Sequence, residues 1–397
     1  MNSELGATPR LQWPARINHV PKEVFVRPDI FEEELRRIFY GREWIGIAHA
    51  GELPNKGDFK TVSVGRVPLL VNRDKDGELH VFYNACSHRA NQVETAASGN
   101  KTEFQCPYHR WRFDAKGRLI HYPAKSDDEF APGFSREQFS LAEPRVAVVH
   151  GIIFVTFSAD TPPIEVALEG YIDHLADIFL GDGRLRLIGY QKTLFKGNWK
   201  TYRDNDAYHA PLLHAAFRML NWQGGKGRQF GNARGHRGYV SELSPHKTEG
   251  TLLKDPSLIA HRGAGSIGSA SLLMFPAFSA IRHMDVINIR FLNPIAVDQT
   301  ELTFAYFCRE DDDAEMVRHR IRQSSNLLGP CGMVSMEDIA VFHRLQIGSH
   351  TPGMAVFQKG VKDEYRLTGE MGQNDESSQL YGWERYRQVM GFERESA

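Results

Sequence analysis

Two short stretches of the sequence each place one cysteine close to one histidine. The first is Cys86-x-His88, and the second, seventeen residues later, is Cys106-x-x-His109. Two loops of this kind together supply two thiolates and two imidazoles. Two thiolates on one iron and two neutral imidazoles on the other make a [2Fe–2S] centre with a raised potential of about −150 to +300 mV. We therefore predict a site that passes one electron at a time.

A zinc ion is the alternative occupant, because two cysteines and two histidines also satisfy tetrahedral zinc. Zinc fingers pair cysteine with cysteine and histidine with histidine, whereas each loop here mixes the two. Cys106 is also followed by a Pro107-Tyr108 turn, which suits a cluster loop. The mixed order favours iron–sulfur over zinc.

A second group of candidate ligands lies in the run DNDAYHAPLLH, which contains Asp206, His209 and His214. Two imidazoles and a carboxylate are the raw material of a two-His-one-carboxylate iron(II) site. In a regular helix these histidines, five residues apart, would point roughly 140° away from each other. Pro211 lies between them and cannot donate to the residue 207 carbonyl, so we expect the helix to bulge and the rings to converge. The alternative is two ordinary surface or core histidines on a helix.

The periodicity indicates which elements position these residues. Residues 29–39 put apolar side chains on one face at helical spacing. Short β-branched and aromatic runs (FKTVSVG, VPLLVNR, LHVFYN and GIIFVTF) follow, and are typical of a compact, mostly antiparallel β domain. Further on, helical stretches at 164–180 and 311–328 flank strand-like runs (SLLMFPAF, VINIRFLNP and LTFAYFCR).

We therefore predict an α+β protein in three parts. An N-terminal segment, 1–43, should pack on the last part, and an all-β domain should cover 44–158. Residues 159–397 should form an antiparallel sheet flanked by helices, a helix-grip-like arrangement. The second group of ligands lies in this last part.

The composition excludes several classes of partner. The 48 Lys and Arg nearly balance the 49 Asp and Glu, and the formal charge of −1 gives no field that would attract nucleic acid or a membrane surface. No signal peptide or bilayer-spanning apolar run is evident, and four cysteines are too few for a disulfide scaffold. We expect a cytoplasmic location.

The first group of ligands resembles the Rieske family, whose pattern is C-x-H-R-(G/A)…C-P-Y-H-x-W-x-F. The sequence matches it at Cys86, His88, Arg89, Ala90, Cys106, Pro107, Tyr108, His109, Trp111 and Phe113. The run FDAKGRL that follows is similar to the hairpin after the second loop in that family. The resemblance implies a Rieske domain holding one [2Fe–2S] cluster over most of residues 40–160.

The second group resembles the catalytic α subunits of Rieske oxygenases, with their N-W-K…(E/D)-N…D-x-Y-H-x-x-x-x-H motif. Matching residues are Asn198, Trp199, Lys200, Asp204, Asn205, Asp206, Tyr208, His209 and His214. The resemblance implies that His209 and His214 bind one Fe(II), and that Asp206 bridges a ligand histidine to His109 across a subunit contact. The stretch after Asn205 looks about two residues shorter than in close family members, so Asp204 is the alternative bridge. The i, i+3 relation to His209 favours Asp206.

The third iron ligand is expected far downstream, in a run that resembles the family's G-P-x-G…(D/E)-D helix. Asp338 is then the carboxylate ligand and Glu337 its neighbouring competitor. The alternative is that both are surface acids at the start of a helix. Cys331 stands where the family usually has a small residue, and we expect it to be a packing thiol.

The resemblance is nearest to the salicylate, anthranilate and terephthalate branch of the family. It implies hydroxylation or cis-dihydroxylation of an aromatic ring with O₂. For an aromatic carboxylate, Arg282 and Arg290 are the candidate bidentate partners. Apolar pocket walls are expected from Phe217, Leu220, Met274 and Phe278.

Electrons must come from elsewhere, because no dinucleotide or flavin motif is evident. We therefore expect a separate reductase, with or without a ferredoxin, so that NAD(P)H acts only indirectly. The resemblance implies an α₃β₃ assembly with a small β subunit, or alternatively α₃. A non-catalytic Rieske electron carrier is the rival function, and it would lack a reactive iron.

Overall fold

The structure is a computed structural model that describes residues 9–205, 208–215, 227–242, 261–263, 267–369 and 371–396. It divides into two compact units. One is Trp44–Thr161, and the other combines Met1–Glu43 with Pro162–Ala397. The predicted residues Asp206, Phe217 and Leu220 lie outside the described residues.

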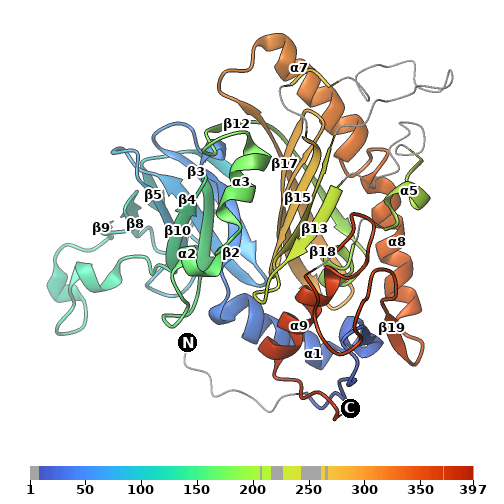
Figure 1. Cartoon of the computed structure of the whole chain (residues 1–397). Helices are drawn as coiled ribbons and strands as arrows, with labels where there is room; N and C mark the ends of the chain where they lie inside the picture. Colours follow the sequence, from blue (N-terminus) through green and yellow to red (C-terminus); the bar gives the residue numbers. More distant parts are fainter. Residues whose placement is uncertain are drawn as a thin grey trace. The chain divides into compact units, whose positions relative to one another are not determined.

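The unit Trp44–Thr161 is built from antiparallel sheets, which confirms the predicted all-β class (Figure 1). The strands are β2 (Ile45–His49), β3 (Asp58–Val64), β4 (Val67–Arg73), β5 (Leu79–Tyr83), β6 (Ser98–Asn100), β7 (Glu103–Gln105), β8 (Arg112–Asp114), β9 (Leu119–His121), β10 (Arg145–Val149) and β11 (Ile152–Thr156). Their orders are β10-β11-β2, β5-β4-β3-β6 and β7-β8-β9. The short 3₁₀ turns η3 (Ala50–Glu52), η4 (Asp127–Glu129) and η5 (Arg136–Phe139) connect them.

The other unit contains a seven-stranded antiparallel sheet in the order β12-β18-β17-β16-β15-β14-β13. The strands are β12 (Leu185–Phe195), β13 (Gly227–Gly231), β14 (Arg237–Glu242), β15 (Ile267–Met274), β16 (Phe278–His283), β17 (Val286–Ala296) and β18 (Gln299–Arg309). A separate pair joins β1 (His19–Pro21) to β19 (Met354–Val356). The predicted antiparallel sheet flanked by helices is thus confirmed.

Helices lie around this sheet (Figure 1). The bounds are η1 (Lys22–Phe25), α1 (Pro28–Glu34), η2 (Leu35–Arg42), α2 (Ile164–Ala167), α3 (Ile172–Phe179), α4 (Trp199–Arg203), α5 (Ala210–Leu213), α7 (Ala314–Gln323), η7 (Ser324–Leu328), α8 (Ser335–Gly348) and α9 (Gln379–Met390). Helix α3 contacts β15 and β16, whereas α4 contacts β17 and α8. No helix in the described ranges is long and apolar enough to cross a bilayer.

Two predicted elements are broken in the structure. The run SLLMFPAF is not one strand, because β15 ends at Met274 and β16 begins at Phe278, with a cis Phe275–Pro276 peptide in the turn. The helical stretch 164–180 is divided into α2 and α3. Gly170 lies between them with φ of +77°, a conformation that helix interiors exclude.

A buried carboxylate joins the N-terminal segment to the rest of its unit. Glu34 accepts hydrogen bonds from Trp199 Nε1 at 2.7 Å, Lys200 Nζ at 2.5 Å and the Tyr386 hydroxyl at 2.5 Å. Burial lowers the pKa of Lys200 to about 8, although Glu34 opposes the shift. This hub links α1, α4 and α9, and gives the Trp199-Lys200 pair of the sequence motif a physical role.

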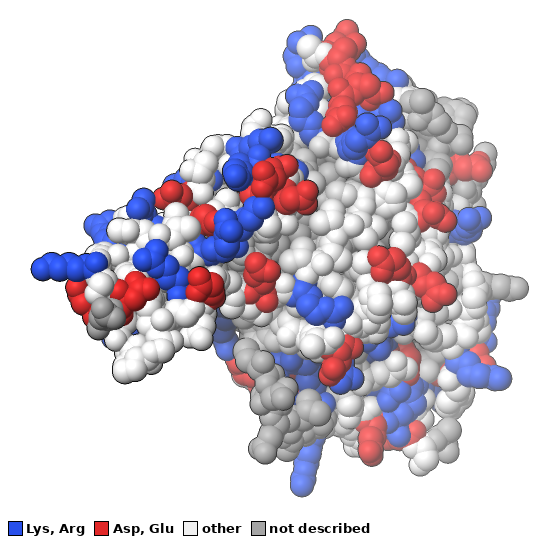
Figure 2. Space-filling model, turned by 90° about the vertical axis from the view of Figure 1, so that its left-hand side faces the viewer, with Lys and Arg blue, Asp and Glu red and all other residues white. Residues whose placement is uncertain are grey.

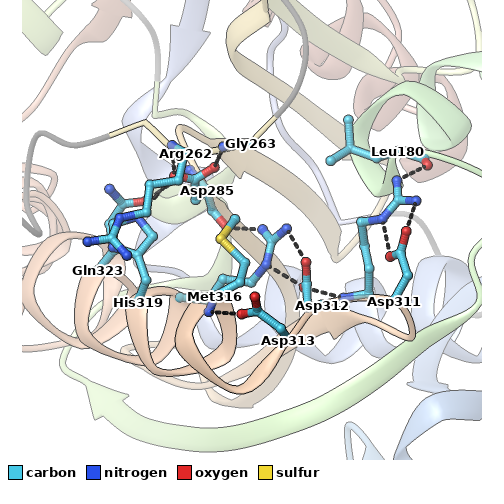
Figure 3. A network of polar contacts seen from close by, with 12 residues as sticks. Leu180, Arg262, Gly263, Asp285, Asp311, Asp312, Asp313, Met316, His319 and Gln323 are labelled. Atoms are coloured by element: carbon cyan, nitrogen blue, oxygen red, sulfur yellow. Dashed lines mark hydrogen bonds and ion pairs between the residues drawn. The ribbon is translucent and has the colours of Figure 1, made fainter.

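A second polar network fastens α7 to the β16–β17 turn (Figure 3). The buried Asp285 carboxylate accepts from the backbone N–H groups of Arg262 and Gly263 at 2.8 and 2.9 Å. It also contacts His319 Nε2 at 3.0 Å, and Arg320 of the same helix donates to the Asp285 carbonyl.

On the face shown in Figure 2, acidic and basic groups are interspersed.

Candidate metal centres

The two loops that carry the predicted cluster ligands have the same backbone conformation. In the first, the Ala90 N–H donates to the Cys86 carbonyl at 2.8 Å. In the second, the Arg110 N–H donates to the Cys106 carbonyl at 3.1 Å. Ala90 and Arg110 both have left-handed φ values, +56° and +60°. Two equivalent turns therefore present the two Cys-His pairs.

The sulfur ligands of these loops are buried and the nitrogen ligands reach the surface. Cys86 and Cys106 are 4% and 1% exposed, whereas His88 is exposed and His109 is half-buried. The two imidazole centroids lie 4.6 Å apart. Desolvation and the neighbouring His109 lower the pKa of His88, which keeps that ring neutral and able to bind a metal. This donor set, two thiols inside and two imidazoles outside, fits a [2Fe–2S] cluster.

Three further side chains converge in the other unit. His209 Nε2 lies 3.1 Å from His214 Nε2, and Asp338 Oδ1 lies 3.2 Å from each of these nitrogens. Ligand bonds of about 2.1 Å at right angles would place donor atoms about 3.0 Å apart on one metal ion. The spacing therefore fits three adjacent positions around a single cation, with other positions left open.

The histidines converge without the bulged helix expected from the sequence. Helix α5 is a single turn, in which Pro211 stands in the first turn and lacks an N–H that would have no partner there. His209 begins this turn, and His214 leaves it with an extended backbone, φ −74° and ψ 111°. The expected interior kink is thus wrong, because the helix ends before the second histidine.

Glu337 and Asp338 divide two tasks between them. Helix α8 places both in its first turn, where Asp338 faces the two Nε2 atoms and Glu337 Oε2 lies 2.9 Å from His214 Nδ1. The Glu337 carboxylate can only accept a hydrogen bond, so His214 carries its proton on Nδ1. The lone pair on His214 Nε2 then faces Asp338. Two lone pairs that face each other at 3.2 Å call for a cation between them. Burial raises the pKa of Asp338, but the interactions with His209 and His214 outweigh burial and hold this pKa well below its usual range.

The start of α8 depends on a glycine of the predicted motif. A Cβ at Gly332 would lie 2.7 Å from the Leu327 backbone carbonyl carbon, so no larger residue fits there. Cys331 beside it is exposed, so the expected packing thiol is wrong.

A cavity opens beside the three convergent side chains, with about 840 Å³ of empty space when its open mouth is included. Its floor is one face of the sheet, because Leu273, Ser279 and Arg290 are direct cross-strand neighbours that all line it. Other lining residues are Tyr202, Asn205, Ala210, Gln229, Arg237, Gly238, Tyr239, Ser271, Ile281, His283, Leu328, Val334 and Ser378.

Three predicted substrate residues do not line this cavity. Met274 pairs with Phe278 across β15 and β16, and Arg282 lies on the same face as these two. Strand side chains alternate between faces, so all three point away from the cavity. Helix α3 contacts these two strands, and the charge of its Asp177 acts on Arg282. Leu273 and Ile281 take the places expected of Met274 and Phe278, which strand parity could have revealed.

The remaining predicted polar residues follow the end of α4. The Asp204 carboxylate accepts a hydrogen bond from Trp383 Nε1 at 2.8 Å. The Asn205 carbonyl accepts from Arg237 Nη2 at 2.6 Å, and Asn205 lines the cavity. Asp206 belongs to the undescribed residues, so the choice between Asp204 and Asp206 as the bridging acid stays a prediction.

Comparisons with known proteins identify two families along the chain. Residues 43–141 match the Rieske [2Fe-2S] domain family, and residues 176–369 match the ring hydroxylating alpha subunit (catalytic domain) family. The chain is 31% identical to the terephthalate 1,2-dioxygenase terminal oxygenase component subunit alpha 2 of Comamonas sp., over 97% of this chain and 99% of the relative.

A salicylate 5-hydroxylase is similar in sequence, and a naphthalene dioxygenase is similar in fold. The large oxygenase component of the Ralstonia sp. salicylate 5-hydroxylase is 29% identical over 85% of this chain and 86% of its own. The crystal structure of naphthalene 1,2-dioxygenase from Rhodococcus sp. bound to indole has the same fold, with a TM-score of 0.82 at 22% identity over 94% of each chain. The chain therefore belongs to the Rieske ring-hydroxylating oxygenases, as an α subunit that uses a [2Fe–2S] cluster, a non-haem iron and O₂.

Proposed function

We propose that this α subunit hydroxylates the ring of an aromatic carboxylate, with Arg290 as the residue that binds the carboxylate. The observation that carries the proposal is the environment of Arg290. Its side chain is 5% exposed and lines the same cavity as His209, His214 and Asp338. None of the described acids forms an ion pair with it. A permanent positive charge in a buried cavity favours an anionic ligand.

The hydrogen bonds of Arg290 decide how a carboxylate can meet it. Four donors are used on neutral partners, namely Asn288 Oδ1 at 2.7 Å, the Tyr202 hydroxyl at 3.2 Å, the Leu328 carbonyl at 3.3 Å and Ser335 Oγ at 3.1 Å. Of the five guanidinium N–H groups, the second one on Nη1 donates to no residue in the described part of the chain. A bidentate contact between Arg290 and a substrate carboxylate, as expected from the sequence, thus requires one of these four partners to be displaced. A single N–H contact with the carboxylate requires no displacement.

The other cavity residues suit an aromatic ring. Leu273, Ile281, Leu328 and Val334 supply apolar walls, and Tyr202 and Ser279 add hydroxyl groups beside Arg290. In this proposal His209, His214 and Asp338 hold the iron, and Glu337 keeps the His214 tautomer. When bound, the iron supplies open positions for O₂, and the cluster supplies electrons. The side chains of the cavity orient the ring and exclude water.

The electron donor is proposed to be a separate reductase, with or without a ferredoxin. The names of the Comamonas and Ralstonia relatives describe them as oxygenase components, which supports a multicomponent system. We further propose an assembly that brings His109 of one copy to the bridging acid, Asp206 or Asp204, of another. Both α₃β₃ and α₃ satisfy that requirement.

The test compares substrates with and without a carboxylate in Arg290→Gln. Loss of a charged hydrogen bond of about 1.5–3 kcal/mol should lower kcat/KM for benzoates roughly ten- to hundredfold. Turnover of a neutral arene, where the wild type shows any, should change little. Arg282→Gln is the matched control, because Arg282 is also buried but lies on the opposite face of the sheet. Equal kinetics of Arg290→Gln and wild type on benzoates would refute the proposal.

The rival function, a Rieske electron carrier, makes a different prediction. Asp338→Ala should keep the cluster absorbance and abolish product formation in an oxygenase. A carrier would transfer electrons as before. Product analysis of the wild type against aromatic acids, amines and hydrocarbons then identifies the substrate.

A further inference from the structure

The side chain of Trp111 connects the two cluster loops. Its indole lies flat against the imidazole of His88, with centroids 4.6 Å apart and an interplanar angle of 8°. The backbone of Trp111 belongs to the other loop, since its carbonyl accepts a hydrogen bond from the Cys106 N–H at 2.8 Å. One residue thus closes the turn around one cysteine and supports the histidine of the opposite turn.

Trp111 is itself fixed by a layer of aromatic side chains. It is 3% exposed and belongs to the buried core that includes both cysteines. The rings of Phe130, Phe134 and Phe139 meet it at steep angles, at centroid distances of 6.2, 6.3 and 5.5 Å. An indole enclosed in this way has little freedom to turn.

The same layer is tied directly to the first loop. The hydroxyl of Ser87, next to His88 in sequence, donates to the Phe139 carbonyl at 2.5 Å. The segment around η4 and η5 therefore contacts the first loop directly through Ser87, and indirectly through Trp111, whose ring stacks on His88. This segment thus contacts residues of both cluster loops, in addition to filling the core.

The second histidine has a different neighbour. His109 contacts Tyr108, with centroids 3.7 Å apart at 33°, and Tyr108 is 53% exposed. Arg89 lies over that tyrosine ring at 5.3 Å. One imidazole therefore rests on a buried, immobilised indole, and the other on a phenol at the surface.

We propose that Trp111 is a positioning residue of the cluster, which orients the His88 ring, keeps water from one of its faces and thereby sets the reduction potential. With two thiolates, two sulfides and two neutral imidazoles, the oxidised cluster is uncharged and the reduced cluster carries one negative charge. Water stabilises the charged form more than an apolar ring does. Loss of the indole should therefore shift the potential in the positive direction.

The experiment uses Trp111→Leu and Trp111→Phe in the full chain with its cluster loaded. Trp111→Leu keeps an apolar side chain but no flat ring, so we expect a more positive potential, an altered EPR spectrum of the reduced cluster, and bleaching by a chelator several-fold faster. Trp111→Phe retains a ring and should recover most of the wild-type values. A Trp111→Leu protein with wild-type potential and EPR spectrum would overturn the proposal.

A second pair of variants separates positioning from general loosening of the core. Phe139→Leu removes a ring that contacts Trp111. It should shift the reduction potential in the positive direction, by less than the shift expected for Trp111→Leu. This variant keeps the test available even if Trp111→Leu fails to hold a cluster. Phe59→Leu is the matched control, because Phe59 lies in the same core but contacts Phe104 at 5.6 Å. It should lower stability and leave the potential unchanged. An unshifted Phe139→Leu, or an equal shift in Phe59→Leu, would contradict the proposed role.

Discussion

Neighbouring acids at the start of α8 have different chemical roles. Asp338 points at the Nε2 atoms of both histidines, whereas Glu337 contacts His214 Nδ1. The sequence could name both acids as candidates, but it could not assign them, because one residue along a helix is a rotation of about 100°. The partner of each acid follows only from where α5 ends.

Glu337 provides a test at the level of single residues. Glu337→Ala should weaken iron(II) binding roughly 10- to 100-fold, because His214 loses the acceptor that fixes its tautomer. Glu337→Gln, which can still accept from Nδ1, should lose less. Calorimetric titration of the iron-free protein with Fe(II) measures both affinities. Equal affinities of Glu337→Ala and wild type would show that the contact does not orient the ligand.

At the level of elements, periodicity predicted the strands better than it predicted their ends. The runs that became β3, β4 and β17 were evident from their β-branched and aromatic residues, since such runs fit a pleated sheet. The run SLLMFPAF contains the turn at Phe275–Pro276, which its apolar residues do not reveal. The predicted cavity residues Met274 and Phe278 pair with each other across β15 and β16, whereas Leu273 and Ile281 line the cavity.

His236, at the entry to β14, connects elements that sequence patterns cannot pair. Its Nε2 donates to the Ala167 carbonyl at 2.9 Å, and its Nδ1 accepts from the Phe275 N–H at 3.0 Å. These contacts join the end of α2 to the β15–β16 turn. Burial lowers the pKa of His236 from 6.5 to about 4, although the contact with Ala167 opposes the shift.

The pH dependence of stability follows from that shift. Between pH 6.5 and about 4 the unfolded chain binds a proton at His236 that the folded chain does not, so its contribution is complete above pH 6.5 and lost as pH falls through this window. The free energy of unfolding should fall by about 3 kcal/mol in total, because each unit of pKa shift corresponds to 1.36 kcal/mol. Relative to His236→Gln, which cannot titrate, the wild type should lose this advantage in urea unfolding between pH 7.5 and 4.5. If the free energy of unfolding depended on pH equally in wild type and His236→Gln, the lowered pKa of His236 would be contradicted.

At the level of the whole molecule, the two predicted centres belong to different units. All four predicted cluster ligands lie in Trp44–Thr161, and His209, His214 and Asp338 lie in the other unit. Ligand types and family motifs were enough to expect this division, because each site is assembled mostly from residues close in sequence. Asp338 is the exception, and only the resemblance identified it.

Separate loss of the two centres is the corresponding prediction. Cys106→Ala should reduce the iron content from about three atoms per chain to about one, and remove the cluster absorbance while Fe(II) binding persists. Asp338→Ala should leave about two atoms and an unchanged cluster spectrum. Iron analysis with EPR distinguishes these outcomes. Loss of both centres in either variant would show that the units depend on each other to fold.

The cysteines of the first centre are buried, and its histidines reach the surface. Charge that enters or leaves this unit should therefore pass over a nitrogen heterocycle and not over sulfur. Any docking protein needs to cover only an imidazole edge to exchange an electron. Reagents that alkylate thiolates should therefore not react with Cys86 or Cys106. Reagents that modify imidazole should react with the histidines and stop electron exchange at this centre.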